Sequence, residues 1–251
     1  CPIDIKQFQA GEQMTYDLYF KYGLIYKKAG ISTLRVTPVS YGGQSAYRAS
    51  LTAKTDGVVR KLFSLDDTLS SIMTTKLVPL EFIKKAHEGS EHTDEHTVYT
   101  YSGGKTNIHA KRIKNGEQRF DERMSSNSCV YDMISVVYYA RTLDYSKMKK
   151  GDVESVEFMS GKKKALMVVE YDGLETIEAN DDKKYSCIKL ILSIANGNKL
   201  AFQDKKESMR VYITNDDNRM PVRLDSKLKV GTTRAFLKSY KGNMYPVKTE
   251  N

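Results

Sequence analysis

The chain has 251 residues, a hydrophobic content of 40% and a formal net charge of +9 at neutral pH. This composition allows a buried core and excludes a globally disordered chain, and no stretch has the roughly 18 to 20 apolar residues of a transmembrane helix. The basic residues are dispersed, apart from the tight run Lys162-Lys163-Lys164, which follows Gly161 and is expected to form a solvated hairpin turn. No recognition helix or aromatic platform accompanies them, so we expect no nucleic-acid partner and favour weak peripheral attraction to an acidic membrane.

Alternating apolar and polar residues dominate the first half of the chain. Residues 13–22 follow this two-residue period cleanly, which is typical of a half-buried strand. Residues 57–63 are expected to form a short helix or a bend, and Asn115-Gly116 predicts a tight hairpin. The same reasoning predicts further strands at residues 31–39, 46–55, 65–74, 77–86, 106–113 and 118–124.

The histidines between residues 87 and 96 resemble a metal motif. His92 and His96 fit the H-x-x-E-H pattern of one zinc-peptidase class. That chemistry needs a helix to bring both imidazoles to one metal ion, and this polar segment has no apolar helical stripe. We therefore expect a charged, exposed hairpin loop and no metal site. His109 stands alone on a predicted strand.

Residues 128–144 break the alternating pattern. Their apolar positions recur at the spacing of a helix with one buried face. Asp132 falls in the expected first turn and Arg141 in the last, as the helix dipole favours. The sequence therefore predicts one amphipathic helix here, with a set of inward side chains that would line any cavity: Met133, Ile134, Val137 and Tyr138.

Strand patterns return after this segment. Asp172-Gly173 is expected to be a hairpin turn, and residues 185–194 are apolar on both faces, which is typical of a central strand. Residues 215–218 lack the glycine and distal glutamate of a calcium loop, so we expect a plain turn. Residues 196–198 predict another turn. The remaining strands are expected at residues 153–159, 165–171, 174–179, 207–214, 220–230 and 232–240.

These elements together predict a mainly β fold. We expect a curved antiparallel sheet or open barrel of about 12–14 strands wrapped around the central helix at about 128–144. No linker or composition break divides the chain, so residues 1–251 are expected to form a single domain, with residues 1–10 as a lead-in to the first strand.

The three cysteines leave several states open. Cys129 and Cys187 lie on apolar segments, and an odd count leaves at least one thiol unpaired or modified. One disulfide is compatible with the sequence, but its partners do not follow from spacing. For Cys1 there are two alternatives, a lipid-modified anchor or an ordinary residue beside a signal cleavage site.

Several short motifs occur along the chain: Gly11-Glu12, Tyr22-Gly23 with Gly30, and residues 77–82, 131–135, 138–141, 173–176 and 217–222. Together they resemble a bacterial exported family described as domain of unknown function 3108. The resemblance spans about residues 11 to 237 and implies export to the periplasm or the outer membrane of a bacterium. It implies no catalytic, cofactor or ligand residues.

No catalytic constellation is apparent, since nucleophile elbows and glycine-rich phosphate loops are absent from the sequence. We therefore expect a non-catalytic envelope protein of unknown function without a cofactor, which binds or carries an apolar ligand or lipid in a concave sheet. The alternative is a structural or protein-interaction module that acts through its surface and has no ligand cavity. The sequence identifies no protein partner.

Overall fold

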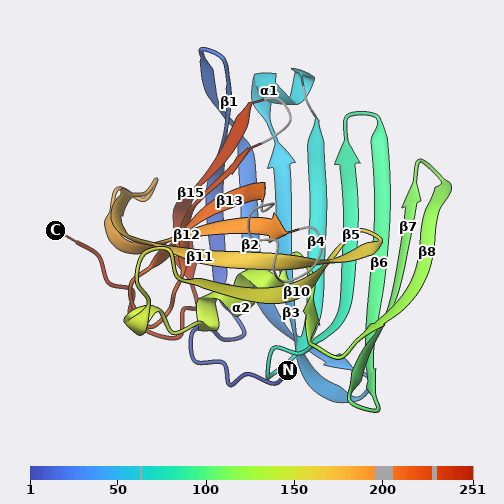
Figure 1. The fold of residues 1–251 in the computed structure, drawn as a ribbon. Coiled ribbons are helices and arrows are strands. Elements are labelled where there is room, and N and C mark those ends of the chain that lie inside the picture. Colours follow the sequence, from blue (N-terminus) through green and yellow to red (C-terminus); the bar gives the residue numbers. More distant parts are fainter. Residues whose placement is uncertain (63, 196–205, 228–230, 251) are drawn as a thin grey trace.

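The computed structural model describes residues 1–62, 64–195, 206–227 and 231–250 (Figure 1). Within these residues, fifteen strands form one sheet that curves into a nearly closed barrel. The mainly β class is therefore confirmed, with more strands than predicted. The strands of the first half are β1 (Gln13–Tyr22), β2 (Ile25–Tyr41), β3 (Gln44–Thr55), β4 (Leu65–Thr74), β5 (Pro79–Glu88), β6 (Glu91–Ser102), β7 (Lys105–Lys114) and β8 (Glu117–Ser126).

The second half contributes the other wall of the barrel. Here β11 is the longest strand and continues through residues 172–173, where its pairing with β12 shifts between Tyr171 and Leu174. The predicted Asp172-Gly173 hairpin is therefore a bulge, which inserts extra residues without ending the strand. These strands are β9 (Val130–Tyr131), β10 (Val153–Ser160), β11 (Lys163–Glu178), β12 (Lys184–Ala195), β13 (Lys206–Thr214), β14 (Pro221–Lys227) and β15 (Thr232–Lys241).

The order of the strands follows the chain with one exception. The first strand, β1, pairs with the last strand, β15, in the middle of the sheet, and β8 and β9 form its two edges. All pairings are antiparallel except that of β9 with β10, which is parallel. The turn predicted at residues 196–198 lies outside the described residues, as do residue 63 and residues 228–230 of the predicted elements.

The helix of the second half is shorter than the sequence predicts. α1 (Gly57–Leu62) connects β3 to β4, a 3-10 turn spans Tyr145–Lys147, and α2 (Ser135–Thr142) replaces the long helix expected at 128–144. Residues 130–131 join the sheet as β9, because an apolar pair suits a buried strand as well as a helix. The side chain of Asp132 then accepts hydrogen bonds from the amides of Ile134 and Ser135, at 2.9 and 2.8 Å, and so starts the helix after itself.

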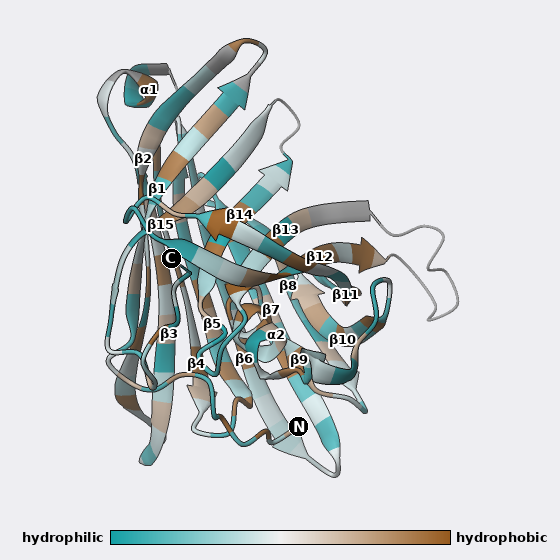
Figure 2. Cartoon of the chain, turned by 90° about the vertical axis from the view of Figure 1, so that its left-hand side faces the viewer, coloured by the Kyte–Doolittle hydropathy of each residue, from teal (hydrophilic) through white to brown (hydrophobic). Residues whose placement is uncertain are grey.

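The core lies between the two walls of the curved sheet, and α2 lies on its concave side between β3–β6 and β10–β11 (Figures 1 and 2). Residues 1–10 precede β1, and Phe8 in this segment is buried at 2% exposure. The largest completely buried side chains include Arg141, Tyr131, Tyr138 and Tyr185. In the described part of the chain, no helix has the length and apolar content needed to cross a bilayer.

Candidate functional site

A buried ion pair joins α2 to the residue before β1. Arg141 and Glu12 are both completely buried, and their side chains meet in two hydrogen bonds of 2.6 and 2.7 Å. Arg141 also donates to the backbone oxygen of Asn218 at 2.8 Å and to that of Gln7 at 3.2 Å. Three segments that are far apart in the sequence are thereby fixed at one point.

Aromatic rings complete the surroundings of Arg141. Its guanidinium carbon lies 5.1 Å from the centre of the Phe8 ring and 5.3 Å from that of Tyr138. Burial opposes the positive charge, but the adjacent Glu12 outweighs this effect and raises the pKa of Arg141. This charged, bidentate pair therefore holds α2, the segment before β1 and the backbone at Asn218 together.

A second buried polar cluster surrounds Asp132. Besides the two backbone amides at the start of α2, its carboxylate accepts a hydrogen bond of 2.6 Å from the hydroxyl of Ser71 on β4. Burial raises the pKa of Asp132, although these hydrogen bonds oppose the shift. Ser71 is completely buried, and the cluster connects α2 to the sheet.

The four predicted cavity residues do not gather around one cavity. Met133 is 52% exposed, whereas Ile134 and Tyr138 belong to the main core. Val137 is half-buried. The prediction of a common inward face is wrong, because the helix starts only at Ser135 and Met133 falls in the turn before it. None of these side chains lines either of the two hollows described below.

The cysteines form one disulfide, between Cys1 and Cys129, and Cys187 is a buried free thiol. Burial raises the pKa of Cys187 to about 12, so it remains a protonated and unreactive thiol. The disulfide uses the same sulfur of Cys1 that a lipid thioether would need. A disulfide and a lipid thioether at Cys1 are therefore mutually exclusive, and this structure holds the bridged form.

A small groove lies next to the disulfide. It encloses about 320 Å³ between the first residues of the chain, β9, β10 and α2. The ring centres of Tyr131 and Tyr139 are 5.0 Å apart beside it. Its wall combines the disulfide and these rings with aliphatic and polar side chains, including Ile3, Val156, Leu166 and Glu157.

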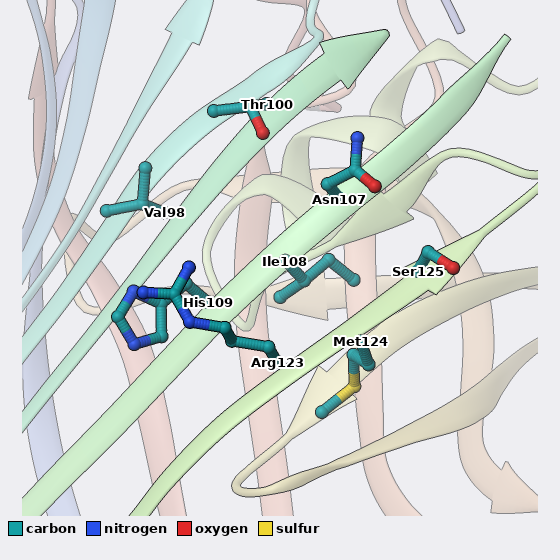
Figure 3. A pocket seen from close by; sticks show the side chains of 8 residues that line it. All are labelled: Val98, Thr100, Asn107, Ile108, His109, Arg123, Met124 and Ser125. Carbon is teal, nitrogen blue, oxygen red and sulfur yellow. The ribbon is translucent and has the colours of Figure 1, made fainter. Parts of the chain in front are cut away.

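A second hollow of about 600 Å³ lies over β6, β7 and β8 (Figure 3). Val98, His109 and Arg123 occupy one row across these strands, and Thr100, Asn107 and Ser125 occupy the next. His109 is held by Asp121 at 2.6 Å. The lining mixes these polar side chains with Val98, Ile108 and Met124 and is open to solvent, whereas small-molecule sites are usually enclosed and mostly apolar.

The inner face of the barrel carries apolar side chains that the core does not fully cover. Leu51 and Leu69 face each other on β3 and β4, in the same row as buried Leu34. On the other wall, Leu224 and Ala235 share a row with buried Val211. These side chains lie toward the end of the sheet that carries α1. The partly exposed apolar residues of this face include Leu51, Leu69, Ile194, Met209, Leu224 and Ala235.

The same row becomes charged farther along the first wall. After Leu69 it continues through Lys84 on β5, Glu95 on β6 and Arg112 on β7. Arg112 donates from Nε to Glu95 at 2.8 Å, and its guanidinium lies 5.1 Å from the centre of the Phe120 ring. Near the end of the sheet that carries α1, the inner face is therefore apolar on β3, β4 and β14. On β6 and β7 it carries the Glu95–Arg112 ion pair.

Residues 87–96 form an exposed hairpin as predicted, but its loop is shorter than expected, because only residues 89–90 form a turn and both flanking segments are strands. His92 and His96 lie on β6, four residues apart, which in a strand separates them by about 13 Å. They cannot share one metal ion at that distance. No group of three or more metal-ligating side chains occurs within the described residues.

Sequence reasoning missed Glu12, Ser71 and the inner-face leucines. Glu12 and Arg141 are 129 residues apart, and no local pattern connects them. The sequence did hold one indication of this contact. Glu12, Arg141 and Asn218 each belong to a motif of the family resemblance, and in the fold Arg141 contacts both of the others.

The fold defines a barrel-like, mainly β protein, and the comparisons place it in a family. The family model described as "Protein of unknown function (DUF3108)" matches residues 15–238, so the chain belongs to that family. The resemblance drawn from the short motifs is thereby confirmed. No match was found among curated proteins.

Two solved structures are similar to the chain. A beta-barrel-like protein of domain of unknown function DUF1849 from Brucella abortus has a TM-score of 0.60 at 9% identity, covering 92% of this chain and 96% of that one. At this identity the similarity shows the fold alone. A putative lipoprotein from Parabacteroides distasonis has a TM-score of 0.33 at 14% identity, with coverage of 96% and 99%, which is too low to support an argument.

Proposed function

We propose that this chain is a non-catalytic protein of the bacterial cell envelope that binds an apolar ligand or lipid on the inner face of its sheet. The observation that carries the proposal is the set of partly exposed apolar side chains on that face, among them Leu51, Leu69 and Leu224. Apolar surface left open on a concave face is typical of ligand-binding barrels.

The charge distribution on this face favours an amphiphile. A hydrocarbon chain would lie along the leucines of β3, β4 and β14, and a polar group would reach the Glu95–Arg112 ion pair. Burying apolar surface contributes about 25 cal/mol per Å², so a long acyl chain has enough area for stable binding. The ligand residues differ from those predicted on the helix.

The disulfide supports an exported location, whether periplasmic or associated with the outer membrane. Disulfides persist in oxidising compartments and are rare where thiols are kept reduced. Cys1 and Cys129 are bridged, and they hold the first residues of the chain against β9 and α2. The non-catalytic assignment is supported by the two buried polar clusters, in which each charged group is occupied by structural partners.

Lipid analysis of the protein tests the proposal. Protein isolated from a bacterial envelope without denaturation is extracted, and bound lipid is identified by mass spectrometry. Purified protein is then titrated with the fluorescent fatty acid cis-parinaric acid. We expect Leu224→Gln to weaken binding about tenfold, because an amide pressed against an acyl chain costs roughly 1–2 kcal/mol.

Leu174→Gln is the matched control, because Leu174 on β11 is 59% exposed and its loss should leave binding unchanged. Protein that carries no lipid and does not bind the probe would contradict the proposal. Equal weakening by both substitutions would also contradict it, since it would show that the probe binds outside the inner face.

A surface-interaction module is the second candidate, and the groove beside the disulfide favours it. Tyr139 is half-buried and provides aromatic surface there, which suits protein interfaces. A photo-crosslinking residue at Ser155, inside the groove, should yield one discrete adduct in envelope extracts. The same residue at exposed Lys85 on β5 should yield none. Adducts from both positions, or from neither, would count against this candidate.

A further inference from the structure

Two histidines from neighbouring strands meet on the β5–β6 hairpin. His87 and His92 are directly opposite each other in the register, and their ring centres are 4.5 Å apart. The sequence motif joins His92 to His96 along one strand, but the fold separates those two. It brings His92 to His87 instead.

The geometry of the hairpin explains this proximity. Gly89 and Ser90 form the turn, Glu88 pairs with Glu91, and the histidines form the next pair outward. The backbone of His92 exchanges hydrogen bonds with Asn115, at 2.7 and 2.9 Å, on the side away from β5. His87 and His92 therefore form a non-hydrogen-bonded pair, the type in which cross-strand side chains approach most closely.

Both imidazoles are available to a ligand. His87 and His92 are exposed, and within the described residues their rings make no hydrogen bond or ion pair. The other histidines differ, because His96 contacts Glu81 at 2.7 Å and His109 contacts Asp121 at 2.6 Å. The four histidines thus divide into two whose rings contact carboxylates and two whose rings contact each other.

We propose that His87 and His92 bind one divalent transition-metal ion and that they bind Cu²⁺ most tightly. Neutral imidazole is a preferred ligand of copper, nickel and zinc, and affinity at a nitrogen site is highest for Cu²⁺ in this series. Two protein nitrogens hold the ion, and water completes its coordination. Asp66, which pairs with His87 across β4 and β5, places a carboxylate in the same row.

Electron paramagnetic resonance with Cu²⁺ alone tests the site. One equivalent of Cu²⁺ is added to the intact chain at neutral pH, and the nitrogen superhyperfine pattern is recorded. We expect a signal with two imidazole nitrogens. His92→Gln should leave one nitrogen and weaken the apparent affinity about 100-fold, because linked ligands gain that factor over single ones.

The double variant His96→Gln/His109→Gln is the matched control, and it should retain the wild-type spectrum and affinity. The double variant His87→Gln/His92→Gln should lose the signal. Wild-type affinity in that variant would overturn the proposal, since copper would then bind elsewhere, for example at the terminal amine. Loss of the signal in the control would overturn it as well.

Discussion

Arg141 and Glu12 are completely buried, and each neutralises the other. Removing one partner leaves an unpaired charge in the core, which typically costs 3–5 kcal/mol. Arg141→Met should therefore lower the free energy of unfolding by about 3–5 kcal/mol in urea titrations. The double variant Glu12→Gln/Arg141→Met should recover part of that loss, because no charge remains buried. A single variant as stable as the wild type would show that the pair contributes nothing to the fold.

Asp132 predicts a pH dependence of stability. Burial raises its pKa in the folded state, so the folded chain holds this proton more tightly than the unfolded chain. That contribution to stability is fully present below the unfolded pKa and is lost as the pH rises through the folded pKa. Asn at this position does not titrate, and its oxygen can still accept from Ile134 and Ser135.

The stability of Asp132→Asn relative to the wild type should therefore increase as the pH rises through that window. Urea unfolding of both proteins from mildly acidic to neutral pH measures the difference. A difference that is independent of pH would contradict the assigned shift. Ser71→Ala serves as a control, because it removes one hydrogen bond to Asp132 and leaves the titrating group in place.

Among the elements, the N-terminal segment depends on its covalent link to Cys129. The disulfide closes a loop with a sequence separation of 128 residues. Loop-closure entropy for a loop of that size corresponds to roughly 5 kcal/mol, and measured values are more often about 2–4 kcal/mol. Cys129→Ala should therefore destabilise the chain by about 2–4 kcal/mol. A reductant should lower the stability of the wild type and leave that of the variant unchanged; equal responses would refute the bridge.

The strands were largely predictable from the sequence, because alternation reports which side chains face the core. The ranges 13–22 and 65–74 coincide with β1 and β4. The helix was predicted too long, because the apolar pair Val130 and Tyr131 fits a helix as well as a strand. Only the contacts of Asp132 determine that the helix begins after it. The pair Asp172-Gly173 has the composition of a turn, but β11 continues through it with a bulge.

The candidate sites were much less predictable. The inner-face leucines alternate like those of any strand, and only their partial exposure distinguishes them. The His87–His92 pair depends on where the hairpin turns, and the polar sequence there did not reveal the turn position. Both features arise from register, which is a property of two segments and cannot be read from either one alone.

For the whole molecule, the net charge of +9 predicts weak adhesion to anionic membranes. The protein should sediment with vesicles of phosphatidylglycerol and phosphatidylcholine, but not with pure phosphatidylcholine. Binding should disappear at about 1 M salt, where the Debye length falls to about 3 Å. Adhesion that persists at high salt would point to insertion of apolar groups and would contradict a purely electrostatic attraction.

The strand order has a consequence for how the molecule assembles. The strands at the two ends of the chain, β1 and β15, pair at the centre of the sheet. As the chain folds from its N-terminal end, β1 to β8 can pair one after another, because each strand follows its neighbour after a short connection. The centre of the sheet stays unpaired until the last strand arrives, because this pairing closes a loop of almost the whole chain. A molecule truncated before β15 would leave one edge of β1 unpaired, and strands of other molecules would pair with that edge and start aggregation.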